Sequence, residues 1–208
     1  MRRFRIGLIA IMVGLAGQAY AQNLKVNKDN SVIAVIVNKT GPLKAMGHHH
    51  FIFASQYEVT TPFNPSTGSG SVTFDHQELI NDLYEVTSLY NDDIVAKGLV
   101  DENFKPLSAE DRSTIRGHML AEDQLGEGRI NVRLISLGEA TAELELTIRG
   151  ARVIREIEAR FEQNGDTAML SLNGPFNFSD FGIKPYSAFG GLLSNKDQFY
   201  IYGRFELN

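Results

Sequence analysis

Apolar and polar residues alternate along the second half of the chain, which is the pattern of half-buried β-strands. Four segments show this alternation, at 141–148, 152–162, 166–178 and 197–207. In the first, Leu144 and Leu146 share an apolar face, while glutamate and threonine occupy the opposite face. Gly150 separates the first two segments, and the Asn-Gly pair at 164–165 marks a hairpin before the third. The pattern therefore predicts four consecutive antiparallel strands that form a meander.

The first half of the chain is less regular. Further strands are predicted at 31–39, which is apolar on both faces, and at 48–55 and 69–75. A helix is predicted at 107–125, where Ser108 and Asp111 resemble a capping pair and Ile115 and Met119 share one helical face with Leu120. Residues 75–85 could form a second helix, and residues 61–70, rich in Pro, Gly, Ser and Thr, are expected to form a loop.

Many strands, few helices and a complete lack of cysteine indicate an all-β fold without disulfide bonds. A closed antiparallel barrel of about eight strands, with one or two short helices, would leave no strand edge exposed to aggregation. The side chains directed inward would be mainly Leu, Ile, Val and Phe, so any cavity is expected to be apolar.

The first 21 residues have the features of a secretory signal peptide. Three arginines precede an apolar stretch that is too short to span a membrane, and Ala-Tyr-Ala at 19–21 resembles a cleavage site. Removal of this segment would leave a single domain at 22–208 and would change the formal net charge from −5 to −8. We expect an exported, periplasmic protein without affinity for nucleic acid, since an acidic chain repels phosphate.

Three consecutive histidines at 48–50 precede Phe51. On a strand His48 and His50 share one face, and His49 shares the other face with Phe51 and Phe53. Three roles stay open for the histidines: a metal site completed by His76 or His118, hydrogen bonds at a barrel end, or contact with a ligand head group. Because Ile52 on the opposite face is also apolar, either face could be the inside; we expect Phe51 and Phe53 to line the cavity, with a plain packing role as the alternative.

No arrangement of residues favours catalysis. The chain has no Gly-x-Ser-x-Gly motif and no cysteine, and its paired glutamates lie on outward faces. Asp-Phe-Gly at 180–182 lacks the other kinase motifs, so a strand that ends in a turn is expected there. The protein is therefore predicted not to be an enzyme and not to need a cofactor.

Several motifs resemble the YceI-like family. They are "LELTIRGARVIREIEARF" at 144–161, "TIRGHMLAEDQL" at 114–125, a Gly-His-x-His variant within "GPLKAMGHHHFI" at 41–52, and the C-terminal "FNFSDFGIKPYSAFGGLLSNKDQFYIYGRFEL" at 176–207. The resemblance implies an exported, lipocalin-like barrel that binds a polyisoprenoid or another long-chain lipid in an elongated internal cavity. A carrier or sequestering role would follow, and a homodimer is possible.

The residues expected to contact such a ligand are aromatic, aliphatic or imidazole side chains. They are His48, His50, Phe51, Phe53, Phe74, His118, Leu144, Leu146, Phe161, Leu172, Phe178, Phe181, Phe199 and Ile201. The alternative function is a metal-handling protein or a metal-dependent enzyme that uses the cluster of His48 and His50. A third is an adaptor with a solid core that binds another envelope protein.

Overall fold

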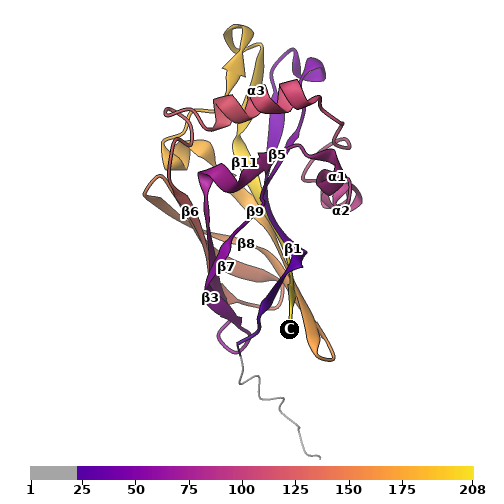
Figure 1. The fold of residues 1–208 in the computed structure, drawn as a ribbon, viewed down its shortest axis with the longest axis vertical. Helices are drawn as coiled ribbons and strands as arrows, with labels where there is room; N and C mark the ends of the chain where they lie inside the picture. The colour runs from indigo at the N-terminus through magenta and orange to yellow at the C-terminus, as the bar shows by residue number, and fades with distance from the viewer. Residues whose placement is uncertain (1–22) are drawn as a thin grey trace, which may run out of the picture.

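One antiparallel sheet forms the body of the protein in a computed structural model that describes residues 23–208 (Figure 1). The predicted signal peptide therefore lies outside the described residues. The strands are β1 (Val26–Thr40), β2 (His50–Ala54), β3 (Glu58–Asn64), β4 (Ser69–Asp75), β5 (Leu79–Asn81), β6 (Arg129–Leu137), β7 (Thr141–Ile148), β8 (Ala151–Asn164), β9 (Thr167–Asn177), β10 (Ser187–Ala188) and β11 (Leu193–Leu207).

Short helices connect the strands. The α-helices are α1 (Tyr84–Thr87), α2 (Asn91–Ala96) and α3 (Ala109–Met119). Single turns of 3₁₀-helix occur at η1 (Lys44–Met46), η2 (His76–Glu78), η3 (Phe178–Phe181) and η4 (Phe189–Gly191). Within residues 23–208, no helix has the length and apolar character needed to cross a membrane.

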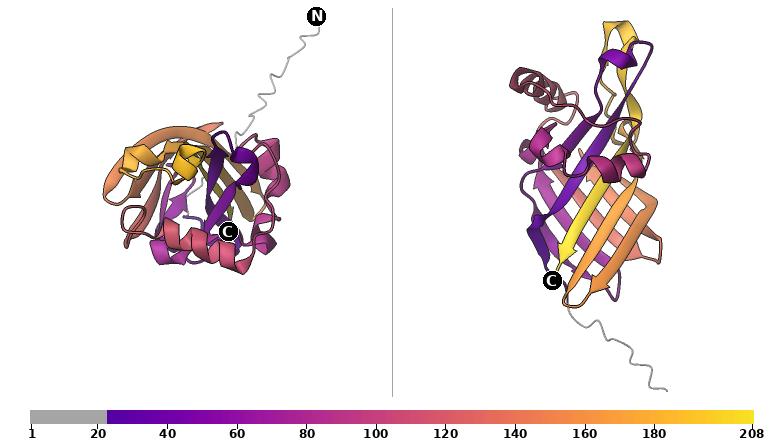
Figure 2. Two further views of the ribbon diagram at one scale, coloured as in Figure 1. Left: turned by 90° about the horizontal axis from the view of Figure 1, so that it is seen from above. Right: turned by 90° about the vertical axis from the view of Figure 1, so that its right-hand side faces the viewer.

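The sheet curls into an open half-barrel (Figures 1 and 2). Its strand order is β3-β4-β6-β7-β8-β9-β11-β1-β2-β5, with β10 beside β11. The two ends of this path, β3 and β5, do not pair with each other. Near the start of β1, Leu24 N–H donates to the Phe63 carbonyl at 2.8 Å, which is an isolated bridge rather than a ladder. The prediction of an all-β antiparallel fold is confirmed, whereas a closed barrel of about eight strands is not observed.

The predicted meander is confirmed. Strands β7, β8, β9 and β11 are successive antiparallel neighbours. Leu144 and Leu146 are each about 1% exposed, on the face that curls inward. Arg149 and Gly150 form the β7–β8 turn with φ values of 51° and 79°, as expected of a two-residue hairpin loop.

Two of the sequence-based predictions are wrong in whole or in part. Only residues 65–68 of the expected loop at 61–70 form a turn, because 61–64 belong to β3 and 69–70 to β4. Pro62 is accepted in β3 because β3 is an edge strand that leaves one side unpaired. Residues 75–85 are not one helix: they form η2, β5 and the start of α1. In contrast, the helix predicted at 107–125 is confirmed as α3, although it ends at Met119, and Ser108 Oγ accepts the Asp111 N–H at 3.0 Å as its N-terminal cap.

Two apolar cores lie on opposite faces of β1 and β2. The concave face carries the larger core, which includes Ile33 and Val37 of β1. The outer face of the same strands packs against α2 and the segment after it, through Ile36, Phe51 and Ile94. The apolar character of both faces of 31–39 is therefore explained by burial on both sides.

A close approach between β8 and β9 accompanies the curl of the sheet. A Cβ atom placed on Gly174 would lie 2.2 Å from Cγ2 of the buried Ile157. Only glycine leaves room for the isoleucine side chain over the neighbouring strand, so Gly174 marks a position where the sheet bends.

We expect Gly174→Ala to lower the free energy of unfolding by about 1–3 kcal/mol, because the new methyl group overlaps Ile157. Urea unfolding monitored by circular dichroism measures this loss. Gly117→Ala is the control, since no atom lies within 4 Å of the added Cβ on α3. It should raise stability by up to about 1 kcal/mol through helix propensity. Equal effects of the two substitutions would contradict the overlap.

Candidate functional site

An apolar pocket of about 210 Å³ lies between the concave face of the sheet and α3. Strands β1, β2, β6, β7 and β11 contribute its wall, and α3 lies across the half-barrel on the remaining side (Figure 2). Aliphatic side chains dominate the lining, among them Val35, Val37, Ile52, Ile115, Ile130 and Ile148. A smaller void of about 50 Å³ lies further along the same face and is lined by Phe63, Leu144, Leu172 and their neighbours.

Local periodicity decides which side chains enter the pocket. On β1, Val35 and Val37 face it, and on β2 the alternate residues His50 and Ile52 do so. On α3, Ile115 and Met119 are four residues apart and therefore lie on one face of the helix. The same face brings His118 to the pocket.

Helix α3 covers the pocket without being buried itself, since none of its residues is buried. Polar contacts hold it against β5. Arg116 donates from Nη2 to the Gln77 carbonyl at 2.7 Å and from Nη1 to the Leu79 carbonyl, and Asn81 Nδ2 donates to the Arg112 carbonyl at 3.1 Å. Few apolar contacts and several polar ones make this helix one of the more easily displaced elements of the structure.

His50 is the polar group of the pocket with the most fixed orientation. Its Nδ1 lies 2.9 Å from Oδ2 of Asp82, whose side chain is only 4% exposed. The other oxygen of this carboxylate accepts the Phe51 N–H at 2.9 Å. A carboxylate can only accept here, so the His50 proton is on Nδ1. The His50 side chain makes no other hydrogen bond among residues 23–208, which leaves Nε2 for a ligand.

His118 and Tyr186 form an aromatic pair at the same pocket. Their ring centroids are 4.9 Å apart, and both side chains belong to the lining. Tyr186 is 41% exposed, so this pair lies where the pocket meets solvent. An apolar ligand would thus pass these rings on entry.

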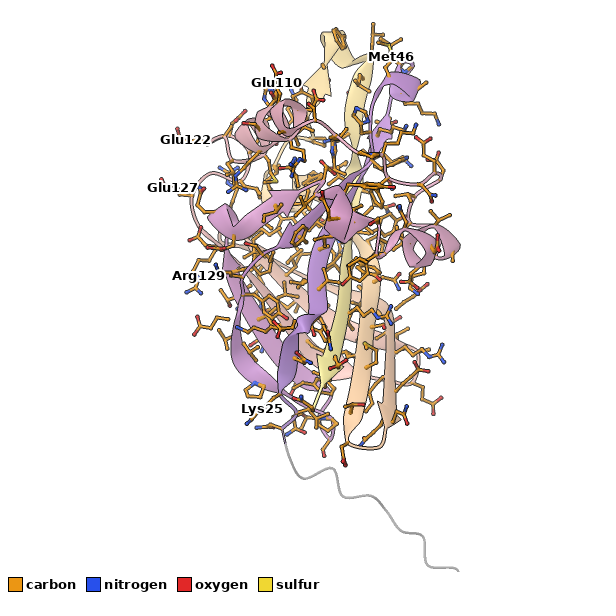
Figure 3. All side chains as sticks on the ribbon, turned by 45° about the vertical axis from the view of Figure 1, so that its right-hand side comes forward. Lys25, Met46, Glu110, Glu122, Glu127 and Arg129 are labelled. Atoms are coloured by element: carbon orange, nitrogen blue, oxygen red, sulfur yellow. The ribbon has the colours of Figure 1, made fainter. Side chains whose placement is uncertain are left out.

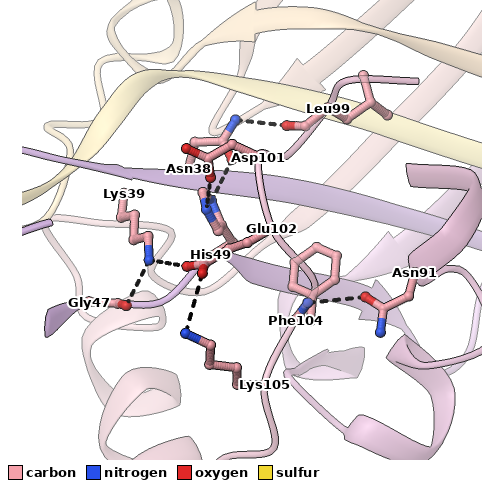
Figure 4. Close-up of polar contacts among 10 residues, drawn as sticks. All are labelled: Asn38, Lys39, Gly47, His49, Asn91, Leu99, Asp101, Glu102, Phe104 and Lys105. Atoms are coloured by element: carbon pink, nitrogen blue, oxygen red, sulfur yellow. Dashed lines mark hydrogen bonds and ion pairs between the residues drawn. The ribbon is translucent and has the colours of Figure 1, made fainter. Parts of the chain in front are cut away.

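His49 points away from the pocket and is part of the outer core (Figure 4). Its Nδ1 lies 2.7 Å from Asn38 Oδ1, and its Nε2 lies 2.7 Å from Asp101 Oδ1. Burial lowers the pKa of His49, and the hydrogen bond with Asp101 opposes that shift. His49 therefore connects β1 and β2 with the 97–105 segment and has no access to the pocket.

A buried lysine ties down the same segment. Lys39 is 9% exposed, donates to the Gly47 carbonyl at 3.2 Å and forms an ion pair with Glu102 (Figure 4). Its hydrogen bond, together with that of Lys105, lowers the pKa of Glu102 to about 2. The 97–105 segment in turn covers the outer core with Leu99 and Phe104.

The structure gives no support to a histidine metal site. Between residues 23 and 208, no group of three His, Cys, Asp or Glu side chains is arranged to hold a metal ion. His76 is fully buried, with Nδ1 3.1 Å from the Gly126 carbonyl, and His48 is exposed outside both voids. His50 is already bound to Asp82.

The predicted ligand contacts are only partly brought together. His50, His118, Phe178 and Phe199 line the pocket, and Leu144 and Leu172 line the smaller void. Phe74, Leu146, Phe181 and Ile201 are buried in the concave core, and Phe161 packs on Phe63 with centroids 5.4 Å apart. The expected orientation of Phe51 and Phe53 is wrong: both belong to the outer core. They contact α2 and the 97–105 segment instead, because the alternation of β2 directs Ile52 inward.

Sequence reasoning missed the partner of His50 and most of the aliphatic lining. Asp82 has a φ of 52°, which is unusual for a residue other than glycine, and it follows β5 directly. No periodic pattern identifies such a residue. Alternation along β1 and β2 would have identified Val35 and Ile52 as inward positions if the burial of the outer face of these strands had been recognised.

Comparisons with known proteins give a likeness of fold. No protein-family model matches the chain, and no curated protein sequence matches it. Among solved structures, BcnA of Burkholderia cenocepacia is similar over 88% of this chain and 99% of its own, with 15% identity and a TM-score of 0.49. A YceI protein of Campylobacter jejuni is similar over 74% and 82%, with 15% identity and a TM-score of 0.48. The solved structures that are similar to this chain thus include YceI proteins.

The ion pair of Glu102 predicts a dependence of stability on pH. Because the pKa of Glu102 falls from 4.5 to about 2 on folding, the stability it contributes is present above pH 4.5 and is lost as the pH falls toward 2. Glu102 is 39% exposed, so we expect Glu102→Gln to cost no more than about 1 kcal/mol at pH 7.

Urea unfolding of the unmodified protein and of Glu102→Gln at pH 7 and pH 3 measures this difference, which should shrink at pH 3. The exposed Glu139, which has no ion pair among residues 23–208, gives the control Glu139→Gln. A Glu102→Gln difference that is the same at both pH values would contradict the assignment.

Proposed function

We propose that the protein binds a long apolar molecule, of polyisoprenoid or fatty-acyl type, and acts as a carrier or sequestering protein without catalysis. One observation carries this proposal: an aliphatic pocket covered by a helix that has no buried residue, with an imidazole held by Asp82 in its wall. The motifs that resemble the YceI-like family favour the same function. The features of residues 1–21 favour export to the periplasm.

Burial alone can supply the affinity. Each methylene group removed from water contributes about 0.8 kcal/mol, so ten of them contribute about 8 kcal/mol without any directional contact. An aliphatic wall built by Val35, Ile52, Ile130 and Ile148 suits a flexible hydrocarbon chain better than a rigid polar molecule.

The size of the pocket indicates that α3 moves when a long chain binds. A pocket of about 210 Å³ is smaller than the range of about 300–1,000 Å³ found for many ligand sites. Displacement of α3 would enlarge it, and the void beside Leu144 would extend it along the concave face. A barrel of about eight strands that closes fully around the ligand stays a prediction.

The polar groups of the pocket favour a neutral head group that carries a hydroxyl. Because Nδ1 of His50 donates to Asp82, Nε2 is the ring nitrogen that can offer a lone pair to a hydroxyl donor. No lysine or arginine is part of the described lining, and the nearby Asp82 is an acid. An anionic head group would therefore lack a strong partner.

Enlarging a wall residue tests the pocket. We expect Val35→Phe to weaken binding of a fluorescent long-chain alcohol at least tenfold, because the larger side chain fills the space that the hydrocarbon needs. Ile154→Phe is the matched control, since Ile154 is 43% exposed and lies outside the pocket. Fluorescence titration measures both, and native mass spectrometry with organic extraction identifies any lipid that co-purifies. Unchanged affinity in Val35→Phe would place the ligand elsewhere.

A pair of ligands tests the role of His50. We expect 1-dodecanol to bind about fivefold more tightly than its methyl ether, since the alcohol alone can donate a hydrogen bond to Nε2. His50→Phe should abolish this preference while the ether still binds. Competition against the fluorescent long-chain alcohol measures both affinities. A preference that persists in His50→Phe would exclude His50 as the head-group contact.

A further inference from the structure

Three large apolar side chains are exposed at one end of the molecule. Met46 is 69% exposed, Phe189 68% and Leu192 46%. They belong to two segments that meet there, 41–47 and 186–193, which we call the tip (Figures 1 and 3). The Leu43 N–H donates to the Leu192 carbonyl at 2.9 Å, and Thr40 pairs with Ser194 at the base of the tip. The three side chains are therefore held at one end of the structure.

The backbone of the tip holds Phe189 in a rare conformation. Phe189, Gly190 and Gly191 have φ values of 52°, 66° and 95°. A positive φ is uncommon for an aromatic residue, and strained positions persist where the surrounding structure imposes them. Here the aromatic ring stays exposed, so burial of Phe189 within the protein does not explain the conformation.

Lysines accompany the tip in an otherwise acidic protein: Lys44 belongs to it, and Lys39, Lys184 and Lys196 flank it in the chain. Residues 39–50 and 183–196 contain four lysines and no Asp or Glu, whereas the whole chain has a formal net charge of −5. Lys39 is paired with Glu102. The other three, Lys44, Lys184 and Lys196, are exposed and form no ion pair among the described residues. Apolar side chains accompanied by unpaired lysines are typical of segments that enter the interface of an anionic bilayer.

The tip is continuous with the wall of the pocket. Tyr186 and Asn195 line the pocket, and the Asn195 N–H donates to the Tyr186 carbonyl at 2.9 Å. Leu192 and Phe189 lie between these two residues in the chain. A surface that receives the tip would thus lie close to the pocket.

We propose that the tip docks on an anionic lipid membrane. Phe189, Leu192 and Met46 enter the boundary between head groups and acyl chains, while the lysines contact anionic head groups. A protein partner fits less well, because a stable protein interface needs about 800 Å² on each side, and three side chains on a narrow projection offer far less. The docking is independent of what the pocket holds, so it stands or falls separately from the proposed ligand.

The complete lack of tryptophan in the chain allows a direct test. In Phe189→Trp the single tryptophan should show a blue-shifted emission with vesicles of phosphatidylcholine and phosphatidylglycerol, and brominated acyl chains should quench it. Leu89→Trp is the control: Leu89 is 74% exposed in the connection between α1 and α2, away from the tip, and should show neither effect. Both variants contain residues 1–21, so a difference between their tryptophan emission shifts does not depend on that segment.

Charge is tested in the same assay. Removing one lysine near an anionic surface should weaken vesicle binding about fivefold, so we expect this loss for Lys44→Ser in the Phe189→Trp background. Lys25 lies at the opposite end of the molecule (Figure 3), and Lys25→Ser should change nothing. Vesicles of phosphatidylcholine alone should bind more weakly.

Three results would overturn the proposal. One is a lack of any blue shift in both Phe189→Trp and Leu192→Trp. Another is an equal shift in Leu89→Trp. The third is a dimer in sedimentation experiments that Phe189→Ser abolishes while vesicle binding is unchanged, which would assign the tip to a second copy of the chain.

Discussion

Burial of both faces of β1 and β2 is the constraint on which the rest of the structure depends. Ile36 and Phe51 pack outward against α2 and the 97–105 segment, while Val35 and Ile52 face the pocket. Because neighbouring residues of a strand point to opposite faces, fixing the outer core also fixes which side chains enter the pocket. Lys39 and His49, on the outer side, secure this arrangement through Glu102 and Asp101.

Strand β5 contacts both the pocket, which Leu79 lines, and the helix α3 that covers the pocket. Asn81 donates to the Arg112 carbonyl of α3 and lies beside Asp82, with a distance of 3.4 Å between Asn81 Nδ2 and Asp82 Oδ2. Asp82 in turn orients His50. Asn81 and Asp82 therefore connect α3 with the imidazole in the wall of the pocket.

Much of the fold could be predicted from the sequence, and much less of the site. The alternation in 141–148 and 197–207 marks the concave face, so the meander follows directly. It does not reveal that Tyr202, on the opposite face of β11, is buried in the outer core. Residues 48–55 are apolar on both faces, and only the helices packed outside reveal that Phe51 and Phe53 belong to the outer core. Asp82 reaches His50 through a tertiary arrangement that leaves no periodic trace. The strand at Pro62 escaped prediction because edge pairing depends on neighbours that local composition does not encode.

Arg116 occupies the outer edge of β5, where it satisfies the carbonyls of Gln77 and Leu79. A strand edge without such a partner is a template on which another chain can add a strand. When α3 lifts, these acceptors lose their guanidinium and face solvent. A form of the protein with α3 displaced and an empty pocket would then expose unpaired carbonyls at β5. Other chains could pair with this edge, and prolonged displacement of α3 would lead to aggregation.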